Sequence, residues 1–284
     1  MLWREIKSRA GILVGLAALA MVALAWRFWA GDDALARIQA SGTIRIGYAV
    51  EAPYAMVAPD GRVTGQSPEL ARLVAARMGI GRVEWVQTGF DALLPQVAEG
   101  RFDVIAAGVF ITPQRRKLVV FSNPTVTVAA GIGTLADASR RYASYGDLVG
   151  DSSVRVAVLA GSVEEGALLA RGMSPKRLVR VPDTAAARAA LESGKVAVLA
   201  LSMPALQWMI ADGAAFAAAK VAGRTAAADP VRTFDVGFVF ARGEDRLLAA
   251  WNAAQDEVKT SPAYLDALAR FGFRVDDLAG SPPP

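Results

Sequence analysis

Arg115 is the residue whose type and position most clearly suggest chemistry in this sequence. It follows the apolar run Val104-Ile-Ala-Ala107, which is typical of a short buried strand. Thr112-Pro113 then suits the start of a helix, because threonine can cap the first turn and proline has no N–H to leave unbonded. Arg115 is therefore expected where a sheet ends and a helix begins, the place where open α/β sheets bind ligands. Its guanidinium could hold a carboxylate through parallel hydrogen bonds, and the alternative is a surface arginine in a helix start.

Strands and helices are expected to alternate on both sides of this stretch. The predicted strands cover residues 43–48, 82–86, 104–107, 154–159, 178–181 and 195–201. Four predicted helices begin at or just after Ser67-Pro68-Glu69, Phe90, Ser162 and Thr184. Three more are predicted at residues 211–222, an alanine-rich stretch, and at 243–260 and 262–271, which close the chain. Two extended segments, 126–133 and 233–241, would cross between two such units. This order predicts an α/β fold with mostly parallel sheets flanked by helices.

The composition excludes several classes of function. The chain of 284 residues has no cysteine and no histidine, which removes thiol catalysis, disulfides, Cys/His zinc sites and any histidine base. It also removes a lipid anchor on cysteine, and we expect no metal and no cofactor. Residues 1–25 hold three Lys/Arg and one Glu of the totals of 31 and 27, so 28 basic and 26 acidic residues remain, a balance of +2. That balance gives no electrostatic reason to expect nucleic-acid binding.

Residues 1–30 are typical of a targeting segment. Basic residues precede an uncharged stretch of 17 residues, Ala10 to Trp26, and Ala23-Leu24-Ala25 supplies a cleavage pattern. The alternative is an uncleaved anchor, because a span needs roughly 17–25 apolar residues. Both alternatives place the rest of the chain outside the cytoplasm.

Short motifs at strand ends, turns and helix starts occur in a specific order between Ser41 and Phe273. They are Gly42-Thr-Ile-Arg-Ile-Gly47, Ala52-Pro-Tyr54, Gly65-Gln-Ser-Pro-Glu69, Leu93-Leu-Pro95, Gly100-Arg-Phe-Asp-Val104, Thr112-Pro-Gln-Arg115, Phe121-Ser-Asn-Pro124 and Phe271-Gly-Phe273. Each motif alone is weak, but their order and spacing are specific. Together they resemble family 3 extracytoplasmic solute-binding proteins, the receptor components of polar amino-acid ABC transporters.

The resemblance implies the two-lobed type II periplasmic-binding-protein fold, in which hinge strands join the lobes and the lobes close on a ligand. We expect lobe 1 to comprise residues 41–127 and 238–275, and lobe 2 to comprise residues 128–237. Residues 276–284 are expected to be a disordered tail.

The resemblance also assigns roles around the cleft. In this family the arginine that matches Arg115 grips the substrate α-carboxylate, helped by a Gly-Ser/Thr pair that Gly161-Ser162 matches. The backbone carbonyl that matches Gly108 and an aspartate of the second lobe usually hold the α-ammonium. Ser202 stands where that aspartate is expected, so one ammonium acceptor is missing. The residues themselves also account for Ser162 as a helix cap, and both roles are compatible.

Four further residues fall on segments that the family directs into the cleft: Glu51, Tyr54, Phe90 and Phe110. A carboxylate and three aromatics opposite an arginine suit a carboxylate ligand whose cation is delocalised or shielded. This is similar to the ectoine/hydroxyectoine-binding branch. The alternatives are an ordinary amino acid or an opine as ligand. For the residues themselves, the alternatives are a solvated loop for Glu51, packing on the sheet edge for Tyr54 and core packing for the two phenylalanines.

The resemblance implies a periplasmic, monomeric receptor that captures a small zwitterion and delivers it to an ABC permease of the inner membrane. Contact with the membrane would occur only through residues 1–30. An enzyme of the cyclohexadienyl or arogenate dehydratase type on the same scaffold is the alternative from another class, with Glu51 as the candidate acid. The sensor module of a tethered receptor is a third alternative.

Overall fold

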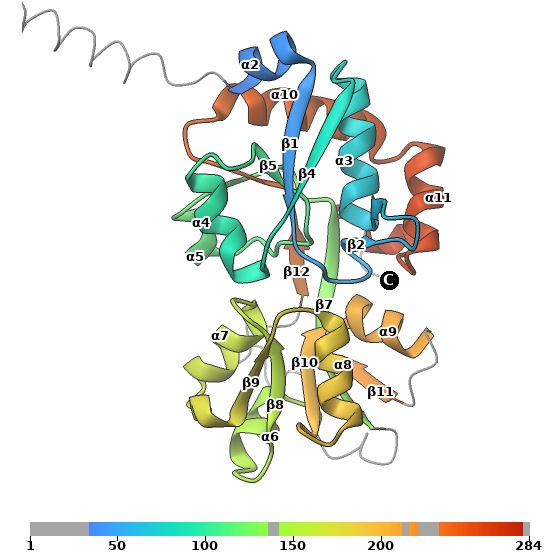
Figure 1. Cartoon of the computed structure of the whole chain (residues 1–284). Coiled ribbons are helices and arrows are strands. Elements are labelled where there is room, and N and C mark those ends of the chain that lie inside the picture. The colour runs from blue at the N-terminus through green and yellow to red at the C-terminus, as the bar shows by residue number, and fades with distance from the viewer. Residues whose placement is uncertain (1–33, 136–141, 212–215, 221–232, 281–284) are drawn as a thin grey trace, which may run out of the picture.

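The computed structural model describes residues 34–135, 142–211, 216–220 and 233–280, and these form two α/β lobes (Figure 1). The expected targeting segment at residues 1–30 lies outside the described residues. Among the described residues, no helix is both long enough and apolar enough to cross a membrane.

Lobe 1 is built on a five-stranded sheet in the order β4-β1-β5-β13-β6. Strand β1 pairs in parallel with β4 and β5, whereas β13 returns antiparallel between β5 and β6. The strands of lobe 1 are β1 (Thr43–Tyr48), β2 (Met56–Val57), β3 (Val63–Thr64), β4 (Arg82–Gln87), β5 (Val104–Ile105), β6 (Val120–Phe121) and β13 (Val239–Phe240). Its helices are α2 (Ala34–Ser41), α3 (Gln66–Arg77), η1 (Phe90–Ala92), α4 (Leu93–Ala98), α5 (Pro113–Arg116), α10 (Asp245–Val258), α11 (Pro262–Arg270) and η4 (Val275–Asp277).

Lobe 2 is built on a second sheet in the order β11-β7-β10-β8-β9, with β12 also paired to β7. Its strands are β7 (Val126–Leu135), β8 (Val156–Leu159), β9 (Leu178–Val181), β10 (Val198–Ser202), β11 (Phe216–Lys220) and β12 (Thr233–Val236). Its helices are α6 (Tyr145–Gly150), α7 (Val163–Ala170), η3 (Pro175–Arg177), α8 (Thr184–Glu192) and α9 (Met203–Ala211).

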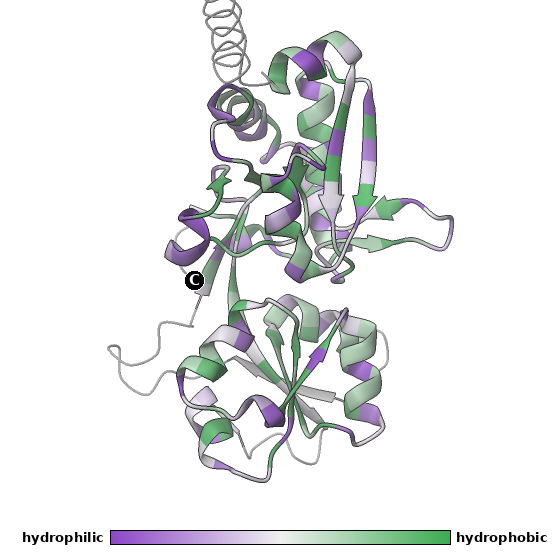
Figure 2. Cartoon of the chain, turned by 60° about the vertical axis from the view of Figure 1, so that its left-hand side comes forward, coloured by the Kyte–Doolittle hydropathy of each residue, from purple (hydrophilic) through white to green (hydrophobic). Residues whose placement is uncertain are grey.

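Alternate residues of the lobe 2 strands enter cores on opposite faces of the sheet. Val156 and Val158 pack with Leu168 of α7, whereas Leu159 of the same strand packs with Leu191 of α8. This follows from the two-residue period of a strand that is covered by helices on both faces. Figure 2 shows mostly apolar strands at the centre of lobe 2, whereas the surrounding helices carry both hydrophobic and hydrophilic residues.

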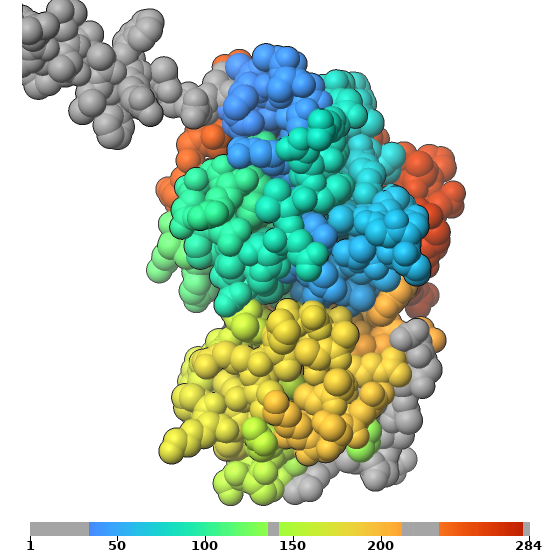
Figure 3. All heavy atoms as spheres, in the orientation of Figure 1, coloured from blue at the N-terminus to red at the C-terminus, as the bar shows by residue number. Residues whose placement is uncertain are grey.

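Two strands cross between the lobes, as the alternation of elements predicts. Strand β7 pairs antiparallel with β12, from Val126 opposite Val236 to Ala129 opposite Thr233. The second expected crossing, at residues 233–241, is divided into β12 and β13 by Gly237 and Phe238. Figure 3 shows atoms of the two lobes in contact on the face that it presents. The crossing strands therefore hold two bodies whose facing surfaces meet.

The alanine-rich stretch at residues 211–222 was expected to be helical, and this prediction is wrong for the part that the structure describes. Helix α9 ends at Ala211, and Phe216–Lys220 form β11, which pairs antiparallel with residues 131–135 of β7. Alanine favours a helix as an isolated residue, but the open edge of β7 offers a full ladder of backbone hydrogen bonds. Tertiary pairing decides the outcome here.

Two chain features differ from the expectations at element ends. Helix α3 begins at Gln66 with Gly65 as its N-cap, so Ser67 is not the cap. The Ser67 hydroxyl instead accepts from the N–H of Gly108 at 3.2 Å.

Residues 276–284 were expected to be a disordered tail, and this is wrong for the first residues of the segment. Asp276 and Asp277 belong to η4, Leu278 bridges to Val126, and residues 281–284 lie outside the described chain.

Candidate ligand-binding site

Arg115 lies at the start of α5, on the side of lobe 1 that faces lobe 2. The Thr112 side chain accepts from the Arg115 N–H at 3.2 Å and Pro113 opens the helix, which confirms the predicted cap. The guanidinium donates from Nη1 to the Phe110 carbonyl at 3.0 Å and from Nη2 to the Gly161 carbonyl of lobe 2 at 3.1 Å. The predicted anion-binding residue therefore spans the junction between the lobes.

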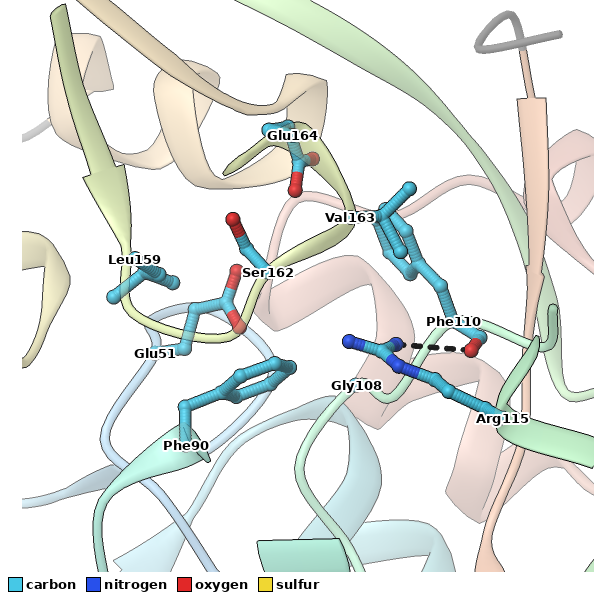
Figure 4. A pocket seen from close by; sticks show the side chains of 9 residues that line it. All are labelled: Glu51, Phe90, Gly108, Phe110, Arg115, Leu159, Ser162, Val163 and Glu164. Atoms are coloured by element: carbon cyan, nitrogen blue, oxygen red, sulfur yellow. Dashed lines mark hydrogen bonds between the residues drawn. The ribbon is translucent and has the colours of Figure 1, made fainter. Parts of the chain in front are cut away.

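A small cavity lies in front of this guanidinium. Residues of both lobes line it: Glu51, Phe90, Gly108, Phe110, Arg115, Leu159, Ser162, Val163 and Glu164. Figure 4 shows the Arg115 guanidinium pointing into the space that the side chains of Glu51, Ser162 and Glu164 border. The cavity combines one fixed positive charge with two carboxyl groups.

Glu51 is a buried carboxyl group that the sequence places correctly beside the predicted cleft. It is 6% exposed, and a tight turn fixes its backbone, with the Glu51 N–H donating to Ala55 and the Tyr54 N–H donating to Glu51. Burial raises the pKa of Glu51 well above its usual value, and the charge of Glu164 raises it further, while Arg115 lowers it. Glu51 is therefore close enough to both groups to interact with them electrostatically.

Glu164 is a lining residue that sequence reasoning missed. It lies in the first turn of α7 and is 4% exposed, and burial raises its pKa above the usual value. Its own backbone N–H, Arg115 and the Ser162 hydroxyl act in the opposite direction and lower it. The available signal was its place two residues after the Ser162 cap, in the first turn of the helix where a carboxylate is favoured by the helix dipole.

Ser162 lines the cavity from lobe 2, whereas Gly161 beside it does not, and the capping pattern expected there is only partly formed. The Ser162 side chain accepts from the Glu165 N–H at 3.2 Å, which confirms the cap. The Glu165 carboxylate accepts from the Gly161 N–H at 2.8 Å, one residue before the position that a capping box requires. Glu165 also pairs with Arg180, so it holds the loop and not the cavity.

Two of the three aromatic residues expected in the cleft line the cavity. Phe90 lies under the Arg115 guanidinium, 5.6 Å from the ring centroid to Cζ. Phe110 stacks on Phe234 with ring centroids 4.8 Å apart and an angle of 14° between the planes. Tyr54 is fully buried behind Gly108 and packs edge-on against Phe273 at 5.5 Å, so it does not line the cavity.

Gly108 lines the cavity, whereas Ser202 does not. Gly108 has φ +65°, and a Cβ at this position would lie 2.4 Å from the Tyr54 ring. Ser202 is 1% exposed and its hydroxyl accepts from the Ala205 N–H at 3.4 Å, at the start of α9. Ser202 also lies near the Tyr54 hydroxyl and lowers the pKa of Tyr54, which burial raises. Ser202 is thus a residue between the lobes and outside the cavity wall.

The described part of the chain contains no group of three or more Asp or Glu residues placed to hold a metal ion.

Residues 44–273 match the family model of bacterial extracellular solute-binding proteins, family 3. The chain belongs to this family. The family resemblance seen in the motifs is thereby confirmed, and the match covers both lobes together with the crossing strands.

Known proteins similar to this solute-binding protein agree with that assignment. A probable amino-acid ABC transporter periplasmic-binding protein of Sinorhizobium fredii is 27% identical over 260 residues, which cover 89% of this chain and 84% of the relative. The crystal structure of EhuB in complex with hydroxyectoine matches with a TM-score of 0.76 at 24% identity, over 84% of this chain and 91% of the other. The ancestral amino acid-binding protein AncCDT-1, a precursor of cyclohexadienyl dehydratase, matches with a TM-score of 0.73 at 25% identity, over 84% and 99% of the two chains.

These likenesses establish the type II periplasmic-binding-protein fold that the resemblance implies. The expectation of mostly parallel sheets is wrong, because β13 and β7 pair antiparallel with their neighbours and make both sheets mixed. As a member of the family, the protein is an extracytoplasmic binding protein for a solute.

Proposed function

We propose that this solute-binding protein captures a small zwitterionic carboxylate, with ectoine or hydroxyectoine as the best candidates, and delivers it to an ABC permease. One observation carries the proposal: a single cavity between the lobes contains the Arg115 guanidinium together with the carboxyl groups of Glu51 and Glu164. A ligand that bears both a carboxylate and a cation matches this arrangement of charges.

Arg115 is the proposed partner of the ligand carboxylate. Burial lowers the pKa of Arg115, but a guanidinium remains charged at neutral pH because its ordinary pKa lies far above neutrality. Nη1 and Nη2 each donate once to a backbone carbonyl, which leaves further N–H donors of the five in the group. The Ser162 hydroxyl and the start of α7 border the same space, where the helix dipole favours an anion.

The proposed cation site lies beside the carboxyl groups of Glu51 and Glu164. Glu51 and Glu164 are both buried, so a ligand cation would meet charges that water screens only weakly. The rings of Phe90 and Phe110 complete the wall and would add cation–π attraction of about 0.5–2 kcal/mol each. Ectoine, a compact cyclic amidinium zwitterion, combines the two charges in a small volume. An ordinary amino acid or an opine is the alternative ligand.

Family membership supports the transport role, and the Sinorhizobium fredii relative is described as part of an amino-acid ABC transporter. We infer that the protein acts in the periplasm, as a monomer, and closes on its ligand by rotation about β7 and β12. The hydrogen bond from Arg115 to Gly161 fits such a closed form, because it joins the lobes. The segment at residues 1–30 would direct export or tether the protein.

The experiment is calorimetric titration of the purified protein with ectoine, hydroxyectoine, glycine betaine, glutamine and arginine. The ectoines should bind most tightly, and tighter binding of glutamine or arginine would refute the ectoine assignment while leaving the receptor role. Arg115→Ala should abolish binding of every carboxylate ligand, because it removes a buried charge-assisted pair. Arg116→Ala is the matched control, since Arg116 lies on the same helix without lining the cavity.

A dehydratase is the second candidate function, favoured by one observation. Glu51 and Glu164 are carboxyl groups with raised pKa in a buried cavity, which is what a general acid requires. Incubation with prephenate decides between the functions. A pure binding protein leaves prephenate unchanged, whereas turnover that Glu51→Gln or Glu164→Gln removes would establish the enzyme.

A further inference from the structure

Glu164 is one of the two carboxyl groups in the cavity, and it is the one that lobe 2 contributes. Ser202, the position where an acceptor for the ligand cation was expected on lobe 2, is outside the cavity wall and occupied by capping α9. Lobe 2 nevertheless contributes a carboxyl group, from a different element: the first turn of α7. The two lobes therefore each present one carboxyl group to the same space, Glu51 from lobe 1 and Glu164 from lobe 2.

We propose that Glu164 and Glu51 form a two-carboxylate clamp, which closes from both lobes on an N–H-bearing delocalised cation of the ligand, an amidinium or a guanidinium. This inference rests on the proposed function and adds to it that the two carboxylates close on the cation from opposite lobes, and that the cation must bear N–H groups.

Two facts about their surroundings favour a ligand group as the partner of these carboxylates. Glu165, the next residue, accepts from the Gly161 N–H and pairs with Arg180. Glu164 instead lines the cavity, where Ser162, its own backbone N–H and Arg115 act on it. Among the described residues that line the cavity, Arg115 is the positive group, and it acts on both carboxyl groups. One guanidinium opposite two carboxylates leaves an excess of one negative charge in the wall when both are ionised.

Fewer aromatic side chains are available to the ligand cation than the sequence predicts. Recognition of the cation therefore depends more on the two carboxylates. Phe90 already faces the Arg115 guanidinium at 5.6 Å, and Phe110 is stacked on Phe234 at 4.8 Å. Tyr54 is behind Gly108. A cage of three rings around a quaternary ammonium is therefore not formed by these side chains.

The geometry of the clamp selects the kind of cation. Two carboxylates that approach from opposite lobes can each accept an N–H of one amidinium or guanidinium, whose donors diverge in a plane. A quaternary ammonium has no N–H to donate. Closure without such a cation brings two buried carboxylates together, which is unfavourable, so the cation is what makes the closed form stable.

The test is the affinity of the wild-type protein, Glu164→Gln and Glu51→Gln for ectoine, arginine and glycine betaine at neutral pH. Loss of one partner of a buried charge pair typically corresponds to at least about 30-fold in affinity. Each single variant should lose at least about 30-fold for the wild-type protein's preferred N–H-bearing ligand, and glycine betaine should bind weakly throughout. Glu192→Gln is the control, because it removes the same charge from lobe 2 on the exposed face of α8, where Glu192 pairs with Arg188.

Thermal unfolding of the variants separates a folding defect from a binding defect. Removing one of two facing carboxylates should leave the unfolding midpoint unchanged or raise it. Unchanged or tighter binding of ectoine and arginine by Glu164→Gln would overturn the clamp while the proposed function stands. Tight binding of glycine betaine by the wild-type protein would overturn the N–H requirement in the same way. If the wild-type protein binds none of these ligands nor glutamine, the proposed function fails, and the clamp fails with it.

Discussion

The Arg115 guanidinium of lobe 1 donates a 3.1 Å hydrogen bond to the Gly161 carbonyl of lobe 2. The same guanidinium is anchored to the Phe110 carbonyl at 3.0 Å and borders the cavity. The residue that we propose to hold the ligand carboxylate therefore also latches the lobes together. Ligand binding and closure share one side chain, so changes at this junction should alter both.

Gly161→Ala should prevent closure without unfolding either lobe. A Cβ at Gly161 would lie 2.9 Å from the Cα of Asp91 in lobe 1, and Gly161 has φ +77°. Ligand affinity should fall by at least tenfold, since about 1.4 kcal/mol of steric cost in the closed form is enough for that loss. Calorimetry measures the affinity, and small-angle scattering measures the closure. Gly194→Ala is the control for backbone strain, because Gly194 has φ +71° with nothing within 4 Å of a Cβ. Equal effects of the two substitutions would show that strain, and not contact between lobes, is responsible.

Phe110→Leu should weaken binding of a ligand with a delocalised cation by about 0.5–2 kcal/mol, the usual contribution of one cation–π contact. The substitution keeps an apolar side chain in the wall and removes the ring. Phe234→Leu removes the same 4.8 Å stack from the other side, and Phe234 is not part of the cavity wall. Titrations of both variants with one ligand decide the matter. If Phe234→Leu costs as much affinity as Phe110→Leu, Phe110 acts by packing alone.

Asp103→Asn should lower the free energy of unfolding by about 1–3 kcal/mol, the range for leaving buried polar groups without their partner. Asp103 is buried and accepts from the Arg45 backbone N–H at 2.9 Å and from the side chains of Arg45 and Arg37 at 2.6 and 2.7 Å. The exposure of the Arg45 and Arg37 side chains, 34% and 42%, keeps the expected loss moderate.

The same variant has a defined pH dependence. Burial acts to raise the pKa of Asp103, but the hydrogen bonds from Arg45 and Arg37 outweigh it and leave the pKa below its usual value. The stabilisation is therefore complete above the ordinary aspartate pKa of about 3.9 and is lost as the pH falls through the lowered value. Denaturant unfolding at several pH values should show the gap between wild type and Asp103→Asn closing below about pH 4. Asp266→Asn is the control, because Asp266 is exposed on α11. This variant should have the same free energy of unfolding as the wild type at every pH. A gap that persists in acid would mean that Asp103 acts by shape and not by charge.

Acid should favour the closed form when no ligand is present. In the closed form, burial raises the pKa of Glu51 and Glu164, whereas opening would expose them to water and return them toward about 4.3. The closed form thus binds protons more strongly than the open form. Its population should therefore fall as the pH rises from the ordinary glutamate pKa through the raised pKa of Glu51 and Glu164. Scattering or fluorescence energy transfer between labels on the two lobes measures the population. The double variant Glu51→Gln, Glu164→Gln should lose most of this dependence, and a wild-type protein whose closure ignores pH would contradict the explanation.

Patterns of neighbouring residues were sufficient to predict the features that form locally. The helix caps at Thr112 and Ser162 and the strand at 43–48 are present as predicted. Hydrogen bonds and burial within a few residues decide whether a cap or an alternating strand forms. Motif order was enough for the family and for placing Arg115, Glu51 and Phe110 at one cleft.

Tertiary structure decided what each side chain meets across the gap between elements. The edge of β7 turned an alanine-rich segment into β11 in place of a helix. Phe273 and Gly108 hold Tyr54 away from the cavity. Glu164 is a cavity residue because the first turn of α7 faces lobe 1. It meets Glu51 there, although the two residues are more than a hundred positions apart in the sequence. Such contacts depend on how two folded lobes meet, and no local pattern of residues records that meeting.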